Sequence, residues 1–302
     1  MNRRSLWLAA LLWPLLAGSL VAEGRVVTPS SPDTIRIKGS DTMAAVTARW
    51  AADYQAQTPG ILLETTGGGS GNGVAALING HVEIATTSRP LKSQEVRQIV
   101  NRSGKQPVLF MVGQDALSVV VHPLNPLHGL SMQQLAGIYG REGTVRRWKD
   151  LGVTVPGCEE REIVPISRKN NSGTYYLLRE DLFKRHQHFQ LGLEHVHTSS
   201  AVVQRVAQTP CAIGYVGMGF VTAAVKNLCI SKGSGPCVPP TAASALEKRY
   251  PMARSLYMVT VGPPSDTVKG FLQWILGPAG QETLKKAGFI PAPKEEAAKV
   301  PF

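Results

Sequence analysis

The chain reads Ile61-Leu62-Leu63-Glu64-Thr65-Thr66-Gly67-Gly68-Gly69-Ser70-Gly71-Asn72-Gly73 where an apolar, β-like run passes directly into a glycine-rich loop. Residues 74–79 then have the spacing of a helix. A helix N-terminus has unpaired N–H groups and a partial positive charge, and glycine lets a ligand approach the backbone closely. The hydroxyl of Ser70 adds a further donor. The stretch therefore predicts an anion-binding loop between a strand and a helix.

Two further loops share this design. Gly39-Ser40-Asp41-Thr42 follows an apolar run at residues 35–37, and Asn171-Ser172-Gly173-Thr174 follows another at residues 163–166. Arg168 stands four residues before Ser172 and carries a fixed fork of donors suited to an oxyanion. One such loop is weak evidence, because these residues are ordinary helix caps. Three loops and an arginine predict convergence on one small tetrahedral anion.

Strand and helix signals alternate along the rest of the chain. This alternation predicts α/β lobes with parallel sheets. Ser131 is the expected N-cap of one helix, with Gln134 at the capping-box position. The charged tail, residues 294–302, is expected to fray. The expected helices cover residues 43–54, 74–79, 91–103, 131–139 and 265–276, and the expected strands residues 81–87, 106–112, 116–121 and 255–261.

The length of 302 residues is too great for one typical core and suits two lobes. We expect residues 116–121 and 255–261 to cross between them. The first lobe is then discontinuous, with residues 33–116 and 255–293, and the second holds residues 117–254. Ligands of open α/β sheets bind outside the carboxyl ends of the strands, so a cleft between the lobes is the expected binding site.

The N-terminus predicts export. Arg3-Arg4 precedes an apolar run from Leu6 to Val21, which is the pattern of a signal peptide over residues 1–22. Two stretches of small residues, 17–19 and 20–22, leave the cleavage site open. No cysteine nearby could carry a lipid, and no later segment is long and apolar enough to span a membrane. The mature chain is expected to be soluble, in the periplasm or secreted.

Four cysteines in an exported chain predict two disulfides, for which three pairings exist. Cys229 and Cys237 bracket a Gly/Pro-rich loop that closes readily, which leaves Cys158 to pair with Cys211. A zinc site is not expected, because the chain has no Cys-x-x-Cys pair.

The composition argues against a nucleic-acid partner. The net charge is +11, but lysine and arginine are spread along the chain with few aromatics between them. A basic solvated surface is therefore favoured. The 43% hydrophobic and 18% charged residues are typical of a globular protein.

Enzyme and metal motifs are also weak. The glycine loop lacks the G-x-G-x-x-G spacing and a following Gly-Lys-Ser/Thr, and Ser70 lacks the final glycine of a hydrolase elbow. The histidines of the stretch 186–197 alternate along a predicted helix and loop, so they do not share one face. We expect no metal site and no cofactor. Asp41 is most simply a residue at the start of a helix. The four histidines are His186, His188, His195 and His197.

From residue 34 to residue 293 the chain resembles the phosphate-binding components of bacterial ABC importers. The order and spacing of the motifs carry this resemblance. It implies a two-lobed type II periplasmic binding-protein fold, with a ligand cleft between the lobes and two hinge crossings. Besides the three loops, the motifs are Ser88-Arg89-Pro90-Leu91, Ala212-Ile213-Gly214-Tyr215, Pro278-x-Gly280-Gln281 and Gly288-Phe289-Ile290-Pro291.

The resemblance implies a monomeric binding protein, not an enzyme, that takes up inorganic phosphate or another oxyanion and delivers it to an ABC permease. Known members carry an aspartate where Ser88 stands, as acceptor for the phosphate proton. Discrimination against sulfate is therefore expected to be looser here, unless Asp41 accepts that proton. The implied phosphate-binding residues are Ser40, Asp41, Thr42, Ser70, Ser88, Arg89, Arg168, Ser172, Gly173 and Thr174.

Two alternatives remain open. An exported phosphohydrolase would use Asp41 or Ser70 and would show turnover and a metal requirement. A sensor or adhesion protein on the same scaffold would close on its ligand without a transporter partner.

Overall fold

The computed structural model describes residues 33–183 and 187–297. The predicted signal peptide, residues 1–22, lies outside this part of the chain, as do His186 and residues 298–302 of the tail. Within the described residues, no helix combines the length and the hydropathy needed to cross a bilayer.

The first lobe is built from both ends of the described chain. Strand β1 pairs in parallel with β2 on one side and β3 on the other. Ile35 and Ile37 alternate inward along β1 and pack with Trp50, Phe110 and Phe271 in one core. Apart from the linking strands, its elements are β1 (Asp33–Gly39), α1 (Ala44–Gln57), β2 (Ile61–Thr66), α2 (Ser70–Ile78), β3 (Ile84–Thr87), α3 (Ser93–Ser103), α8 (Asp266–Leu276), α9 (Pro278–Lys286), β11 (Ile290–Pro291) and α10 (Lys294–Ala297).

The second lobe has its own core, in which Tyr139, Trp148 and Tyr215 are fully buried. The hydroxyl of Tyr139 lies 3.1 Å from the carbonyl oxygens of both Ile166 and Ile213, which ties helix α4 to two strands. The elements are β5 (Gly129–Ser131), α4 (Met132–Tyr139), η1 (Trp148–Leu151), β6 (Val164–Arg168), α5 (Gly173–Leu182), β7 (Glu194–Val196), α6 (Ser199–Gln208), β8 (Ala212–Gly217), η2 (Met218–Phe220), β9 (Lys226–Ser231) and α7 (Ala242–Leu246).

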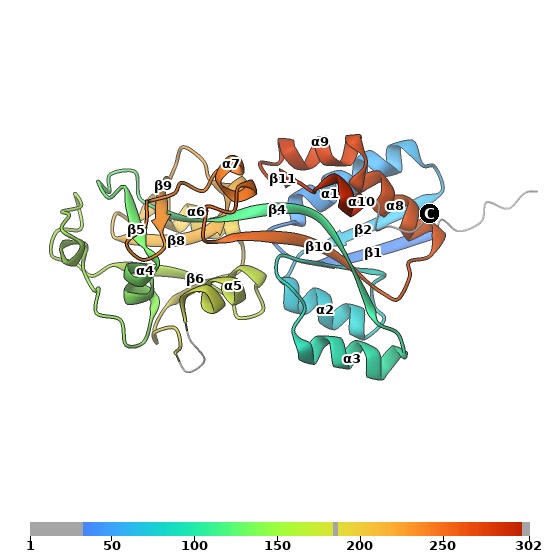
Figure 1. The fold of residues 1–302 in the computed structure, drawn as a ribbon, viewed down its shortest axis with the longest axis horizontal. Helices are drawn as coiled ribbons and strands as arrows, with labels where there is room; N and C mark the ends of the chain where they lie inside the picture. Colours follow the sequence, from blue (N-terminus) through green and yellow to red (C-terminus); the bar gives the residue numbers. More distant parts are fainter. Residues whose placement is uncertain (1–32, 184–186, 298–302) are drawn as a thin grey trace, which may run out of the picture. The chain divides into compact units, whose positions relative to one another are not determined.

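Two strands link the lobes, β4 (Pro107–Val121) and β10 (Ala253–Val261). Strand β4 pairs with β10 as far as Ala116 and with β8 from Leu117 onward. The strand order is β2-β1-β3-β10-β4-β8-β6-β7. Figure 1 shows β4 and β10 side by side, which agrees with their pairing. We propose that the boundary between the lobes falls between residues 116 and 117 on β4 and between residues 254 and 255 on β10.

The expected parallel pairing is found within each lobe, where β1 pairs with β2 and β3, and β6 pairs with β7 and β8, but the sheet as a whole is mixed. Strand β10 is antiparallel to β3 and to β4, and β4 is antiparallel to β8. A chain that passes into the second lobe on one strand and returns on its neighbour must run in opposite directions there. The two runs expected at residues 106–112 and 116–121 form one continuous strand, β4. Gly113 stays in the strand because β11 pairs with it, and a Cβ there would lie 2.4 Å from Leu284.

Two element ends differ from the sequence expectation. Helix α2 begins at Ser70 rather than at Val74, so the second half of the glycine loop is helical. Gly73 allows this, because a Cβ at that position would lie 2.4 Å from the carbonyl oxygen of Lys38 in β1. The tail does not fray from residue 294, since Lys294–Ala297 forms the short helix α10.

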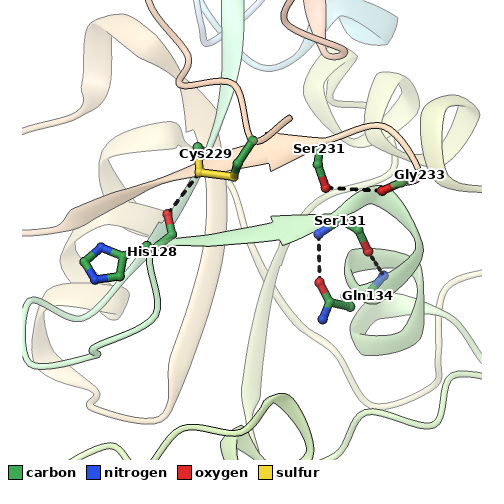
Figure 2. Close-up of a disulfide and its surroundings, with 7 residues drawn as sticks. His128, Ser131, Gln134, Cys229, Ser231 and Gly233 are labelled. Atoms are coloured by element: carbon green, nitrogen blue, oxygen red, sulfur yellow. Dashed lines mark hydrogen bonds between the residues drawn. A yellow bond between two sulfur atoms is a disulfide. The ribbon is translucent and has the colours of Figure 1, made fainter. Parts of the chain in front are cut away.

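Both predicted disulfides are present, Cys158–Cys211 and Cys229–Cys237. The second lies against Gly129 of β5, where a Cβ would approach both sulfur atoms. Figure 2 shows this bond, with the carbonyl oxygen of His128 3.4 Å from the sulfur of Cys229. It also shows the capping box in which Ser131 and Gln134 bond each other's backbone N–H, which confirms the predicted start of α4.

The two disulfides are expected to differ in their effect on stability. The residues of Cys158–Cys211 are 53 apart and those of Cys229–Cys237 only 8 apart. On the chain-entropy model, the long loop contributes about 4 kcal/mol to the free energy of unfolding and the short one about 2.5 kcal/mol. Urea denaturation of Cys158→Ala/Cys211→Ala and of Cys229→Ala/Cys237→Ala checks this order. An equal or larger loss for the short loop contradicts it.

Candidate functional site

Polar loops from both lobes meet where their strands end. Thr42 lies in the loop after β1, Ser70 at the start of α2, and Thr174 in the first turn of α5. The hydroxyl oxygens of Thr42 and Thr174 are 3.2 Å apart across the lobes. A Cβ on Gly173 would lie 2.4 Å from the hydroxyl oxygen of Ser70 and 2.5 Å from that of Ser88. The structure therefore places Thr42 against Thr174, and the neighbouring Gly173 against Ser70 and Ser88.

The site is buried from water. Ser40, Ser70, Ser88, Arg168 and Thr174 are each at most 2% exposed, although all of them are polar. Burying a polar group is costly unless it finds a hydrogen-bond partner. In the described part of the chain, the hydroxyl of Ser40 and the Nε of Arg168 have none. These two donors make the site suited to an acceptor group that enters between the lobes.

Arg168 is held at the end of β6 by neighbours on several elements. Its Nη2 donates to Asp41 Oδ2 at 2.8 Å and to the carbonyl of His197 at 2.7 Å, and its Nη1 donates to Ser199 Oγ at 3.0 Å. Burial lowers the pKa of Arg168, and the nearby Asp41 carboxylate opposes this. The guanidinium stays charged in either case. Its Nε is left for another acceptor.

Two of the four predicted histidines, His195 and His197, contact Arg168. The carbonyl of His197 accepts from the guanidinium, and Nδ1 of His195 lies 2.9 Å from the backbone oxygen of Arg168. Across the described ranges, 33–183 and 187–297, no cluster of His, Cys, Asp or Glu could hold a metal ion.

Asp41 connects the two lobes. Its Oδ2 accepts from Arg168 of the second lobe, and its Oδ1 accepts from the backbone N–H of Gly68 at 2.8 Å. Asn171 adds two more contacts across the lobes: its Nδ2 donates to the carbonyl of Gly68, and its backbone carbonyl accepts from the N–H of Gly71. Asp41 is not in a helix, since α1 begins at Ala44. Each of its oxygens accepts one donor and keeps a second lone pair, so these contacts leave Asp41 able to accept a phosphate proton as well.

Two further predicted residues, Ser172 of the second lobe and Ser88 of the first, take distinct places. Ser172 caps α5, and its hydroxyl oxygen accepts from the backbone N–H groups of Thr174 and Tyr175. Ser88 donates its backbone N–H to Ser70 Oγ at 3.2 Å.

Arg89 is the one predicted residue whose side chain the structure directs elsewhere. Its guanidinium donates to both carboxylate oxygens of Glu95, at 2.6 and 2.8 Å, and to the carbonyl of Pro90. It also lies 5.1 Å from the ring centroid of Tyr176, in a cation–π contact with α5 of the second lobe. Arg89 therefore contributes to the contact between the lobes and not to the hydroxyl cluster.

Two residues of the site were missed from the sequence, Asp115 of β4 and Arg254 of β10. Arg254 donates to Thr174 Oγ1 at 2.9 Å and to Thr42 Oγ1 at 3.3 Å. The same guanidinium donates to Asp115 Oδ2 at 2.8 and 2.6 Å. The sequence does contain a signal for this pair. Asp115 directly precedes the apolar run 116–121 and Arg254 directly precedes the run 255–261, and both runs are expected to cross between the lobes.

Comparison with known proteins agrees with this geometry. A family model described as a PBP superfamily domain matches residues 26–279. The phosphate-binding protein PstS of Pseudomonas aeruginosa is 33% identical over 272 residues, which cover 86% of this chain and 84% of that protein.

Solved structures show the same fold. One is a candidate phosphate ABC transporter substrate-binding protein from Clostridium perfringens with bound phosphate, at a TM-score of 0.76 and 25% identity, covering 86% of this chain and 100% of that one. Another is an ABC-type phosphate transport receptor from Vibrio cholerae, at a TM-score of 0.68 and 24% identity, with the same coverage. The chain therefore belongs to the PBP superfamily and, within it, to the family of the phosphate-binding protein PstS.

Proposed function

We propose that this protein captures inorganic phosphate between its two lobes and delivers it to an ABC permease. The observation that carries the proposal is the cluster of buried donors contributed by both lobes, in which Arg168 Nε and Ser40 Oγ have no partner in the described chain. The relatives support the choice of phosphate, since PstS is named as a phosphate-binding protein and the Clostridium structure holds phosphate.

The donors come from backbone and side chains together. Helices α2 and α5 begin at Ser70 and Gly173, and the first N–H groups of a helix have no partner within it. The N–H groups of Gly71, Thr174 and Tyr175 already donate to Asn171 and Ser172, which leaves those of Ser70 and Gly173 for an anion. The hydroxyl oxygen of Ser172 accepts two backbone N–H groups, so its own proton is left to donate to an anion. A hydrogen bond to a charged group contributes about 1.5–3 kcal/mol, so a few of them suffice for micromolar affinity.

Binding and closure are coupled in this proposal. An anion that contacts Thr42 and Ser70 of one lobe and Arg168 of the other stabilises the conformation in which these groups are together. The anion can shift the equilibrium between open and closed conformations only to the extent that it binds the closed one more tightly. A closed, loaded form would then dock on the permease as a monomer, after export to the periplasm.

The alternative of a phosphohydrolase receives little support from the geometry. The family is one of transport substrate-binding proteins and not of enzymes. Asp41 is held by Arg168 and Gly68, and Ser70 Oγ accepts from the N–H of Ser88. A sensor or adhesion protein would use the same site, and phosphate uptake by cells that lack this protein separates those functions from transport.

Replacing Arg168 tests its assignment. We expect Arg168→Met to weaken phosphate binding at least about tenfold, because a charge-assisted hydrogen bond is lost. Arg168→Lys should recover only part of the affinity, since the planar fork is absent. Titration calorimetry measures the dissociation constant. Arg205→Met is the matched control, because Arg205 pairs with Glu194 at the surface of the same lobe. Equal affinities of Arg168→Met and Arg205→Met would remove Arg168 from the site.

Gly173→Ala tests the coupling of binding to closure. The new Cβ would lie 2.4–2.5 Å from the hydroxyls of Ser70 and Ser88, so the lobes could not approach as closely. We expect phosphate binding to weaken at least about tenfold, while the melting temperature without phosphate is unchanged, because alanine is well tolerated in a helix. Gly235→Ala, in an exposed loop, is the control. Retained affinity in Gly173→Ala would show that this contact does not limit closure.

The proposal also predicts no hydrolysis. The purified protein should bind one phosphate per chain and release none from an aryl phosphate, with or without added divalent metal, because no nucleophile and base are paired among the described residues of the site. Turnover that survives repurification and is lost in Ser70→Ala or Asp41→Ala would favour the enzyme.

A further inference from the structure

Arg254 contacts the site but lies outside the three predicted anion-binding loops. It lies on β10, one of the two strands that link the lobes, and is 6% exposed. Its Nη1 reaches Thr174 of the second lobe and its Nη2 reaches Thr42 of the first. One guanidinium thus contacts a hydroxyl from each lobe.

The direction of these hydrogen bonds is settled by chemistry. A guanidinium has donors and no acceptor, so the oxygens of Thr42 and Thr174 can only accept from Arg254. The proton of each hydroxyl must then point away from Arg254. The two hydroxyls lie 3.2 Å apart, and a hydrogen bond between them uses only one of the two protons. At least one proton is left to donate to a bound oxyanion.

The strands that link the lobes hold Arg254 in place. Asp115 of β4 accepts from its Nε and Nη2 through Oδ2, and Asp115 Oδ1 accepts from the backbone N–H of Met218 at 2.9 Å. The pair packs against Gly217, where a Cβ would lie 2.5 Å from Asp115 Oδ2 and 3.2 Å from Arg254 Nη2. With Asp115 fully buried, this guanidinium has little freedom to reorient.

We propose that Arg254 is a positioning residue that turns the hydroxyls of Thr42 and Thr174 into donors toward the anion. Because the two threonines come from different lobes, Arg254 bonds both only when the lobes are together. It therefore couples the linking strands to ligand binding. This inference rests on the proposed binding of phosphate at the same site.

A double-mutant cycle tests this role. The dissociation constant for phosphate is measured by calorimetry for the wild type, Arg254→Met, Thr42→Val/Thr174→Val and the triple variant. We expect Arg254→Met to weaken binding at least about tenfold in the wild type but less than about threefold when both hydroxyls are already absent. Arg249→Met is the matched control, because Arg249 precedes the same strand and pairs with Glu247 at the surface. Its affinity should equal that of the wild type.

A second variant guards against misfolding. Arg254→Met leaves Asp115 buried without its partner, which can destabilise the fold. Asp115→Asn/Arg254→Met removes both charges and should show the same loss of affinity with less effect on the melting temperature.

The outcomes separate the two proposals. If the wild type binds phosphate and Arg254→Met either binds equally well or loses the same factor in both backgrounds, Arg254 does not act through the threonines, and the proposed function stands. If the wild type binds neither phosphate nor sulfate, the proposed function is wrong, and this inference falls with it.

Discussion

The ion pair between Asp41 and Arg168 is the interaction on which the rest of the site depends. The side chain of Arg168 is 1% exposed and that of Asp41 is 13% exposed, so neither charge is well solvated. A buried pair gains little net stability, yet removing one partner is costly because the other charge stays buried alone. Asp41 also holds the glycine loop through Gly68, and Arg168 also holds the start of α6 through Ser199. The pair therefore sets the register of three segments against one another.

Charge at the site is balanced before any ligand enters. Arg168 pairs with Asp41, Arg254 with Asp115, and Arg89 with Glu95. The negative charge of an oxyanion would then be met mainly by N–H and O–H dipoles that are already oriented. Such groups act strongly where water is excluded, because they need no reorganisation when the anion arrives. The two lobes can thus bring several positive charges together without strong mutual repulsion.

Features that depend on local sequence were predictable, and those that depend on distant partners were not. The loops at Ser40, Ser70 and Ser172, the cap at Ser131 and the pairing of Cys229 with Cys237 follow from short patterns of residues. The start of α2 at Ser70 depends on the contact of Gly73 with β1, and the continuity of β4 depends on its pairing with β10 and β11. Likewise, the side chain of Arg89 pairs with Glu95 of α3, and Arg254 bonds threonines that are 80 and 212 residues away, and no short pattern of residues predicts either contact.

The discontinuous first lobe has a consequence for how the chain reaches its native structure. Strand β10 pairs with β3, so this sheet cannot be completed until almost the whole chain has been synthesised. Both disulfides, and the core of the second lobe apart from Ile290, are formed from residues that precede β10. Pairing between distant segments carries a high loop-closure entropy and is slow. The second lobe can therefore fold first and bring β4 and β10 together. The N-terminal strands β1 to β3 complete their sheet only when β10 pairs with β3.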